Sequence, residues 1–202
     1  MIEPYYDEDG ITIYNADCRD VLPQLEPVDL VLTDPPYGIG IAANPFRQKY
    51  AKLEWDSQPP DAAVFDVIMA KSSHQVIWGG NYFPLPPSQG FFIWDKCQPE
   101  DFSSAMCEMA WTNRQAPAKL FRYRVTGYYK EHPTEKPVSL MRWCAGFFPE
   151  AKTIFDPFMG SGTTLRAAKD MGLKAVGIEI EKKYCDIAIE RLRQRSLLPA
   201  MA

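Results

Sequence analysis

Short β-rich runs alternate with stretches of helical periodicity along most of this chain. Such alternation predicts βαβ units, and therefore an α/β fold with a mainly parallel sheet and helices on both faces. The expected strands are Ile11–Tyr14, Val28–Leu32, Val76–Trp78, Phe91–Trp94, Met106–Trp111, 119–125, Thr153–Phe155 and Ala175–Ile178. The expected helices are Ala62–Ala70, one opened by Pro137, one that follows Gly162 to about Met171, and a last one with Tyr184, Ile187, Ala188 and Leu192 facing inward.

The length of 202 residues suits one domain with a substantial core and leaves little room for a second, so residues 1–202 are predicted to form a single domain. A composition of 46% hydrophobic and 24% charged residues is typical of a soluble globular protein. No apolar run approaches the ~20 residues that span a bilayer, and residues 1–10 lack the pattern of a signal peptide. We therefore expect a cytoplasmic protein with no membrane association.

The cysteines are odd in number, scattered and without a Cys-x-x-Cys pair, which indicates reduced thiols. They are Cys18, Cys97, Cys107, Cys144 and Cys185. Only two histidines occur, and no Cys/His cluster is present, so we predict no metal site.

Residues 154–164 combine a strand, a tight Gly160-Ser161-Gly162 turn and a helix start. Glycines let the backbone approach a ligand, and a helix N-terminus offers N–H groups to a carboxylate or phosphate. Glu179 ends the following strand, where an acid can accept hydrogen bonds from ribose hydroxyls. Position 165 is Leu and no Gly-Lys-Ser/Thr follows, so neither the dinucleotide pattern nor a P-loop is complete. S-adenosylmethionine, a nucleoside that carries a carboxylate, fits this combination.

Asp34-Pro35-Pro36-Tyr37 follows a short apolar strand, at the sheet edge where open α/β sheets place their sites. The prolines remove N–H donors, which leaves the Asp34 carboxylate and the Pro35 carbonyl as acceptors. Such acceptors suit the amino group of a nucleobase, since binding its two hydrogens frees the nitrogen lone pair. Tyr37 offers a flat face for a base that has left the DNA stack.

The net charge of −4 argues mildly against nucleic acid as a partner, because phosphate binding favours a basic face. Local clusters nevertheless carry the opposite charge. Between residues 114 and 130 basic side chains interleave with aromatic ones and no acid occurs, a pattern suited to stacking and phosphate contacts. We predict DNA contacts from Arg47, Lys49, Arg114, Lys119, Arg122, Arg124 and Lys130.

These segments together resemble the amino-methyltransferases of DNA, which make N6-methyladenine or N4-methylcytosine. The order resembles the permuted subgroup called β, in which the Asp-Pro-Pro-Tyr block comes first and the glycine turn last. Further matching segments are Asn15–Leu22, His132–Pro137, Phe155–Thr164 and Gly177–Glu179. The resemblance implies a seven-stranded, Rossmann-like methyltransferase sheet, S-adenosylmethionine as cofactor and double-stranded DNA as substrate.

The resemblance also assigns roles to individual residues. It places the base at Asp34, Pro35, Pro36 and Tyr37. It places the cofactor at Asp17, Cys18, Thr134, Lys136, Asp156, Phe158, Gly160, Ser161, Gly162, Thr163 and Glu179. Asp at the first position of the block favours adenine N6 over cytosine N4.

The middle of the chain is short for this family, which often inserts a target-recognition region there. About 93 residues, 38–130, separate the Asp-Pro-Pro-Tyr block from His132, and several of them must form strands. We therefore expect small recognition loops within 41–58 and 112–130, or help from a second subunit such as a homodimer partner.

Other functions remain as alternatives: N4-cytosine methylation, RNA or protein-glutamine methylation, and a non-catalytic DNA-binding subunit. RNA and glutamine enzymes tend to carry Asn before Pro-Pro-Tyr and to place the cofactor turn first. A non-catalytic subunit predicts a damaged site, whereas both motifs are intact here. Cys97-Gln98 resembles part of the cytosine-C5 nucleophile motif, but Lys96 replaces its proline, and we interpret Cys97 as incidental.

Overall fold

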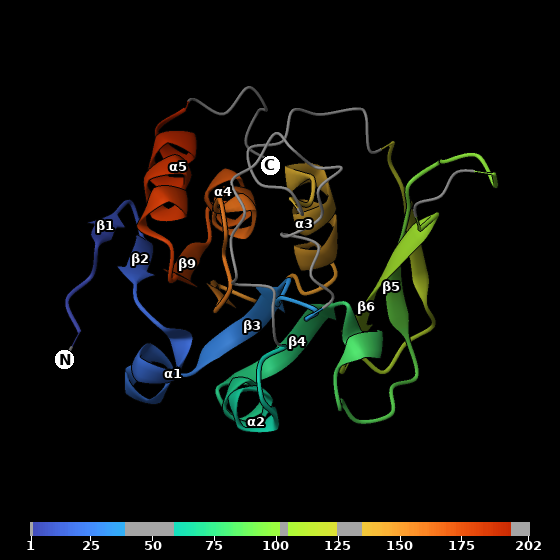
Figure 1. Ribbon diagram of the computed structural model, residues 1–202, viewed down its shortest axis with the longest axis horizontal. Helices are drawn as coiled ribbons and strands as arrows, with labels where there is room; N and C mark the ends of the chain where they lie inside the picture. The colour runs from blue at the N-terminus through green and yellow to red at the C-terminus, as the bar shows by residue number, and fades with distance from the viewer. Residues whose placement is uncertain (1, 39–58, 102–104, 125–134, 195–202) are drawn as a thin grey trace.

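A computed structural model describes residues 2–38, 59–101, 105–124 and 135–194 of the chain. Nine strands form one sheet in the order β1-β2-β9-β8-β3-β4-β6-β5-β7 (Figure 1). Their bounds are β1 Tyr6–Glu8, β2 Ile11–Asn15, β3 Val28–Thr33, β4 Ser72–Trp78, β5 Phe91–Asp95, β6 Cys107–Thr112, β7 Lys119–Arg122, β8 Thr153–Asp156 and β9 Lys174–Glu179.

The helices are α1 Cys18–Val21, α2 Ala62–Ala70, α3 Val138–Ala145, α4 Thr163–Asp170 and α5 Lys182–Arg193, with short 3-10 turns η1 Leu22–Gln24 and η4 Gly80–Tyr82. Helices α3, α4 and α5 cover one face of the sheet, and α1 and α2 cover the other (Figure 1). Within the described ranges no helix is long and apolar enough to cross a membrane.

The sheet is mainly parallel, as expected. Its central strands β2, β9, β8, β3 and β4 pair in parallel, whereas β1 and β6 run opposite to their neighbours. The seven strands implied by the family resemblance are too few, since the described residues form nine, and eight of these match strands expected from the sequence pattern. Strand β1 was not predicted, because its three residues, one buried and two exposed, are too few to show a periodic pattern.

Alternating side chains of the central strands enter two separate cores. Leu30 and Leu32 of β3 pack toward α3, α4 and α5, whereas Val31 packs with Val64 and Phe65 on the other face. Strands buried on both faces are continuous apolar runs, which is why the sequence indicated them without a period of two.

The sheet order changes direction between β3 and β8. The chain passes from β3 through α2 to β4 on one side, and from β8 through α4 to β9 on the other. The carboxyl ends of two neighbouring strands with diverging connections leave a crevice, the usual ligand site of open α/β sheets. Asp34 follows β3 and Asp156 ends β8, so both lie at this crevice.

Candidate active site

A cavity of about 410 Å³ opens at the carboxyl ends of β3, β8 and β9. All four residues of Asp34–Tyr37 line it. The predicted cofactor residues that line it are Asp17, Cys18, Lys136, Asp156, Phe158, Gly160, Ser161, Thr163 and Glu179. Thr134 lies outside the described residues. The volume falls in the range of about 300–1,000 Å³ that is usual for cofactor sites.

Asp156 ends β8 beneath the cavity and is almost fully buried. Its Oδ1 accepts hydrogen bonds from Thr33 Oγ1 (2.7 Å) and from the Phe158 N–H (3.1 Å). Burial raises the pKa of this carboxyl to about 6, and the hydrogen bonds only partly oppose that rise. Asp156 therefore ties β3 to the turn that follows β8.

Glu179 ends β9 and faces the turn between β8 and α4. Its carboxylate accepts the Gly160 N–H at 3.0 Å and the Glu181 N–H at 2.8 Å. Burial raises its pKa to about 7, although the two backbone hydrogen bonds favour the charged form and lower the pKa. A carboxylate held by backbone donors at the wall of a cavity retains lone pairs for a ligand hydroxyl.

The two glycines of the turn differ in what they face. Gly160 and Gly162 both have positive φ, 52° and 78°. A Cβ on Gly162 would lie 2.6 Å from the Ala188 Cβ on α5. Gly162, predicted among the cofactor residues, does not line the cavity, because its bare Cα is where helix α5 packs.

A buried polar cluster fixes the start of α4 to helix α5. Arg191 of α5 donates to both oxygens of the Glu135 carboxylate at 3.0 Å and to Thr163 Oγ1 at 2.9 Å. Ser161 Oγ donates to the same carboxylate at 2.9 Å. Glu135 lines the cavity but was not predicted from the sequence, since only its contact with a helix 56 residues later reveals it.

Asp17 and Cys18 also line the cavity, at the point where α1 begins. Asp17 caps α1 by accepting the Arg19 N–H at 2.9 Å, and it pairs with the Arg19 guanidinium. The hydrogen bonds from Arg19 hold the pKa of the Asp17 carboxyl below its usual value. Burial raises the pKa of the Cys18 thiol to about 12, so this thiol stays protonated.

Asp34 and Tyr37 are connected to each other and to Lys136. The Tyr37 hydroxyl donates to Asp34 Oδ1 at 2.7 Å, and Lys136 Nζ lies 2.5 Å from Asp34 Oδ2. The Tyr37 ring stacks on Tyr82 of η4 with ring centroids 4.8 Å apart. It also lies on Gly79, where a Cβ would come within 2.2 Å of the ring. The pattern of the sequence indicated neither Tyr82 nor Gly79 as part of the site.

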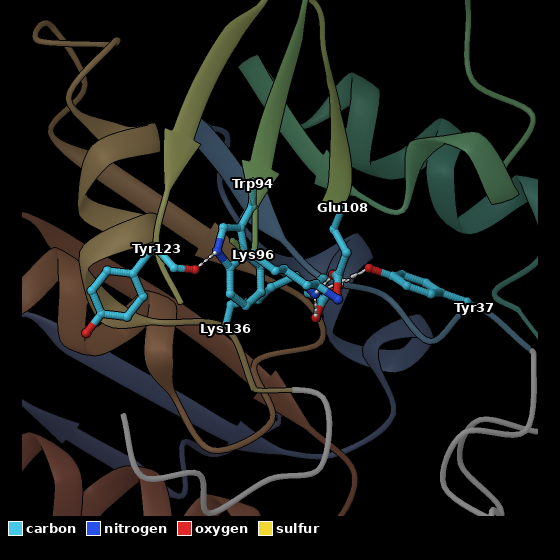
Figure 2. A network of polar contacts seen from close by, with 7 residues as sticks. Tyr37, Trp94, Lys96, Glu108, Tyr123 and Lys136 are labelled. Atoms are coloured by element: carbon cyan, nitrogen blue, oxygen red, sulfur yellow. Dashed lines mark hydrogen bonds and ion pairs between the residues drawn. The ribbon is translucent and has the colours of Figure 1, made fainter. Parts of the chain in front are cut away.

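Lys136, predicted among the cofactor residues, also makes contacts that the sequence did not indicate. Its ammonium group lies between two carboxylates, at 2.5 Å from Asp34 and 2.9 Å from Glu108 of β6, although its side chain also borders the cavity. Figure 2 shows Glu108 and Tyr37 converging on this group. No sequence motif contains Glu108, so only the pairing of strands brings it here.

Comparisons with known proteins identify the family once this geometry is known. Residues 71–190, more than half of the chain, match the family of N6/N4 methyltransferases described as "DNA methylase". The chain belongs to the N6/N4 DNA methylase family. It is thus an S-adenosylmethionine-dependent DNA amino-methyltransferase, and the family resemblance inferred from the sequence is confirmed.

Individual relatives can be aligned with almost the whole methylase chain. The Type II methyltransferase M2.DpnII of Streptococcus pneumoniae is 24% identical, with 95% of this chain and 93% of the relative aligned. The structure of the M1.HpyAVI–SAM complex is 25% identical, covers 91% of this chain and 100% of its own, and has a TM-score of 0.59. PvuII DNA methyltransferase, described as cytosine-N4-specific, shares the fold with a TM-score of 0.66 at 15% identity over 97% of this chain and 91% of its own.

Four of the basic residues predicted to contact DNA lie in the described part of the methylase, and none of these four lines the cavity. Lys119 and Arg122 are exposed on the edge strand β7, and Arg124 follows it. Arg122 pairs with Asp95 at 3.2 Å, and the Arg114 guanidinium lies over the Phe147 ring. Arg47, Lys49 and Lys130, the loop 41–58 and the end of the loop 112–130 lie outside the described residues.

All five cysteines of the methylase lie within the described residues, three of them buried and two exposed. Each of the five cysteines is a free thiol. No group of three or more His, Cys, Asp or Glu side chains there could hold a metal ion. Cys97 is exposed and its N–H donates to Asp95, away from the cavity.

Proposed function

We propose that the chain transfers the methyl group of S-adenosylmethionine to N6 of adenine in double-stranded DNA. The observation that supports this most is the position of Asp34. It follows β3 at the wall of the cavity, with Pro35 and Tyr37 beside it, and Gly160 and Glu179 line the same cavity. A base amino group held at Asp34 would therefore be next to a cofactor bound along the glycine turn.

The cofactor side of the cavity fits the parts of S-adenosylmethionine. Glu179, fixed by the Gly160 and Glu181 N–H groups, would accept the ribose hydroxyls. The loop and helix start around Ser161 and Thr163 would face the carboxylate end, and Asp17 with Phe158 the adenine. When bound, the cofactor supplies an electrophilic methyl group on a sulfonium centre.

The base side supplies acceptors and a stacking face. Asp34 and the Pro35 carbonyl would accept the two hydrogens of the amino group, which frees the nitrogen lone pair to attack the methyl carbon. The carbon–sulfur bond breaks as the carbon–nitrogen bond forms, and the nitrogen then loses one proton. Positioning and electrostatic stabilisation are sufficient for this step, and no covalent bond to the protein is needed.

Tyr37 would hold the extruded base against its ring. In the free protein its hydroxyl occupies Asp34 Oδ1, and Tyr82 covers one face of its ring. Unstacking a base costs a few kcal/mol, which stacking on an aromatic side chain partly offsets. We infer that an incoming amino group replaces the Tyr37 hydroxyl as the hydrogen-bond donor to Asp34.

The single catalytic domain would contact phosphates through the basic edge around β7. Lys119, Arg122 and Arg124 are exposed there.

The alignment with M2.DpnII spans 255 positions, 53 more than the 202 residues of this chain, so that relative carries residues within the aligned region that this chain lacks. We propose that small loops, supplemented by a second copy of the chain in a homodimer, provide site recognition.

Cytosine N4 is the alternative target, because the same acceptors suit either exocyclic amino group. The likeness to PvuII methyltransferase extends to the fold alone. We favour adenine because the first position of the tetrapeptide is Asp34, where N4-cytosine enzymes more commonly have Ser.

The test uses methyl-labelled S-adenosylmethionine and unmethylated genomic DNA, followed by digestion to nucleosides and identification of the labelled one. Asp34→Ala is expected to reduce transfer by about 100-fold or more, since removing one preorganised partner of the transition state typically costs that much. Asp7→Ala, which removes an exposed carboxylate bonded to Thr12 on β2, serves as the control.

Each outcome separates the possibilities. Label in N6-methyladenine that disappears in Asp34→Ala supports the proposal. Label in N4-methylcytosine keeps the chemistry and replaces the target base. No label in DNA, although the cofactor binds, overturns DNA as the substrate.

A further inference from the structure

Four charged side chains of alternating sign form a line that ends at the Asp34 carboxylate. Lys136 Nζ lies 2.5 Å from Asp34 and 2.9 Å from Glu108 Oε2, and Lys96 Nζ lies 2.5 Å from Glu108 Oε1. The four residues come from the ends of β3 and β5, from β6 and from the segment before α3. Figure 2 shows the line from Lys96 through Glu108 to Lys136 and on to Tyr37.

Aromatic rings lie beside both lysines of the line. The Lys136 side chain is 3% exposed, and its ammonium group lies 5.6 Å from the Tyr37 ring centre and 5.7 Å from that of Trp78. Lys96 lies over the Trp94 ring, and the Trp94 indole N–H donates to the Tyr123 carbonyl oxygen (Figure 2). The buried Lys136 ammonium therefore needs its two carboxylate neighbours, because burying an isolated charge is very costly.

Stability alone is a weak reason for such an arrangement. Replacing a buried ion pair with apolar side chains of similar volume often leaves stability unchanged or improves it. Two features instead relate the line to the reaction. It ends on Asp34, and Lys136 also contacts the Tyr37 hydroxyl at 3.3 Å.

We infer that Lys136 and Glu108 are positioning residues for methyl transfer: the Lys136 ammonium, held in place by Glu108, orients the Asp34 carboxylate and balances its charge. This inference rests on the proposed function of Asp34 as an acceptor for the amino group. An ionised Asp34 has lone pairs to spare for that amino group after Lys136 has bound one oxygen. The O–H group of a protonated Asp34 would instead be a hydrogen-bond donor facing the N–H groups of the base, which are donors as well.

The charges around Asp34 make the effect of each substitution predictable. Burial raises the pKa of Asp34, Lys136 lowers it and Glu108 raises it. The other groups that face Asp34 are the Tyr37 hydroxyl, which donates to it, and the Asp156 carboxyl, whose pKa Asp34 raises. Burial by itself would lower the pKa of Lys136, but Asp34 and Glu108 raise it above its usual value, so Lys136 remains charged.

Two substitutions should therefore shift the acid limb of the pH–rate profile, the part where the rate falls as Asp34 is protonated, in opposite directions. Lys136→Met keeps an unbranched side chain and removes the cation, so the acid limb should move to higher pH by about 1–3 units. Glu108→Gln removes a like charge near Asp34, so the limb should move to lower pH, with a slower plateau because Lys136 loses one anchor. Combining the two changes should return the limb part of the way from its position in Lys136→Met.

The experiment measures single-turnover methyl transfer to DNA from pH 5.5 to 9, with saturating cofactor already bound so that cofactor affinity does not shape the profile. Cofactor affinity is measured separately by calorimetry. Lys169→Met is the matched control, since it removes a lysine paired with Asp9 at 3.0 Å on the surface. Circular dichroism checks folding, and Glu108→Gln alone still tests the inference if Lys136→Met does not fold.

Opposite shifts of the acid limb, with cofactor affinity within about threefold of wild type, would support the inference. An unmoved acid limb in Glu108→Gln, or a loss of cofactor binding in Lys136→Met with an unchanged pH profile, would overturn it and return Lys136 to a role in holding the cofactor. Failure of the wild-type protein to label DNA would instead remove the proposed function, and the inference with it.

Discussion

At the scale of single residues, the site depends on acids that are buried or half-buried before any ligand arrives. Glu179 and Asp156 face the cavity, and burial raises both pKa values, to about 7 and about 6. Backbone N–H groups hold Glu179 in place, so its orientation does not depend on a ligand. Such a carboxyl binds hydroxyl groups well only when it is ionised, which links cofactor affinity to pH.

We predict that cofactor affinity falls as pH drops below about 7, because protonated Glu179 must first lose its proton. Glu179→Gln should weaken binding about tenfold or more, since a hydrogen bond to a charged group is worth about 1.5–3 kcal/mol, and should abolish the pH dependence. Calorimetry at pH 6, 7 and 8 measures both effects. Glu190→Gln, on the exposed side of α5, should leave both unchanged; equal pH profiles for wild type and Glu179→Gln would contradict the prediction.

At the scale of elements, the turn between β8 and α4 is shaped as much by helix α5 as by the cavity. Gly162 lies against Ala188, and Arg191 reaches from α5 to Thr163 and Ser161. Arg166 of α4 in turn donates to the Arg191 carbonyl oxygen at 2.7 Å. The last helix of the described chain therefore supports the loop that we propose binds the cofactor.

Gly162→Ala should destabilise the protein by about 2–4 kcal/mol, because the new Cβ adds an overpacked contact to an unfavourable positive φ. The contact is with Ala188, whose Cβ would lie 2.6 Å from the added methyl carbon. Gly172→Ala is the matched control: its φ is 69°, but nothing lies within 4 Å of a Cβ there. Urea unfolding measures both variants.

The control should lose only about 1 kcal/mol, the usual cost of the backbone conformation. Equal losses in the two variants would mean that α5 does not restrict the turn. A partial recovery in the double variant Gly162→Ala with Ala188→Gly would confirm that the contact with α5 causes the difference.

At the scale of the whole molecule, the sheet order unites segments that are far apart in sequence. Thr33 of β3 donates to Asp156 of β8 across 123 positions of the chain, and Asp34 meets Lys136 across 102. The same crevice thereby collects Asp34, Asp156 and Glu179, three acids whose pKa values are all raised, first of all by burial. Concentrating acids in this way lowers the stability of the free protein near neutral pH.

We predict that the melting temperature of the free protein falls as pH rises from about 5 to 8. The folded-state pKa values of Asp156 and Glu179, about 6 and about 7, exceed their ordinary values of 3.8 and 4.5. Their stabilising contribution is therefore complete below the ordinary values and is lost as pH rises through the folded-state values. Differential scanning calorimetry should show a fall of several degrees, since about 1 kcal/mol shifts the midpoint of such a chain by about 2–4 °C.

Glu179→Gln should flatten this fall, and bound cofactor should reduce it, because a ligand that prefers ionised Glu179 adds stability where the carboxylate is charged. A melting temperature that rises steadily from pH 5 to 8 in the free protein would contradict the prediction.

Local sequence patterns were sufficient to predict most helices and strands, and to place the tetrapeptide Asp34–Tyr37 at the end of a strand. Helix α2 has the expected bounds Ala62–Ala70, and β2, β3 and β9 differ from expectation by one residue at one or both ends. Apolar runs, glycine turns and proline positions act over a few residues, so a single sequence is enough to interpret them. The placing of Asp34–Tyr37 and Glu179 at strand ends follows for the same reason.

The sequence by itself therefore determined the order of the longer helices and of every strand but β1, the family, and many of the residues that border the cavity. Only the tertiary structure decided that Lys136 turns to Asp34, that Glu108 and Lys96 continue the line, and that Gly162 faces α5. The physical reason is range: hydrophobic periodicity and turn chemistry act between near neighbours in the chain. Charge pairing and close packing instead depend on which strands and helices become neighbours in space, and that depends on the sheet as a whole.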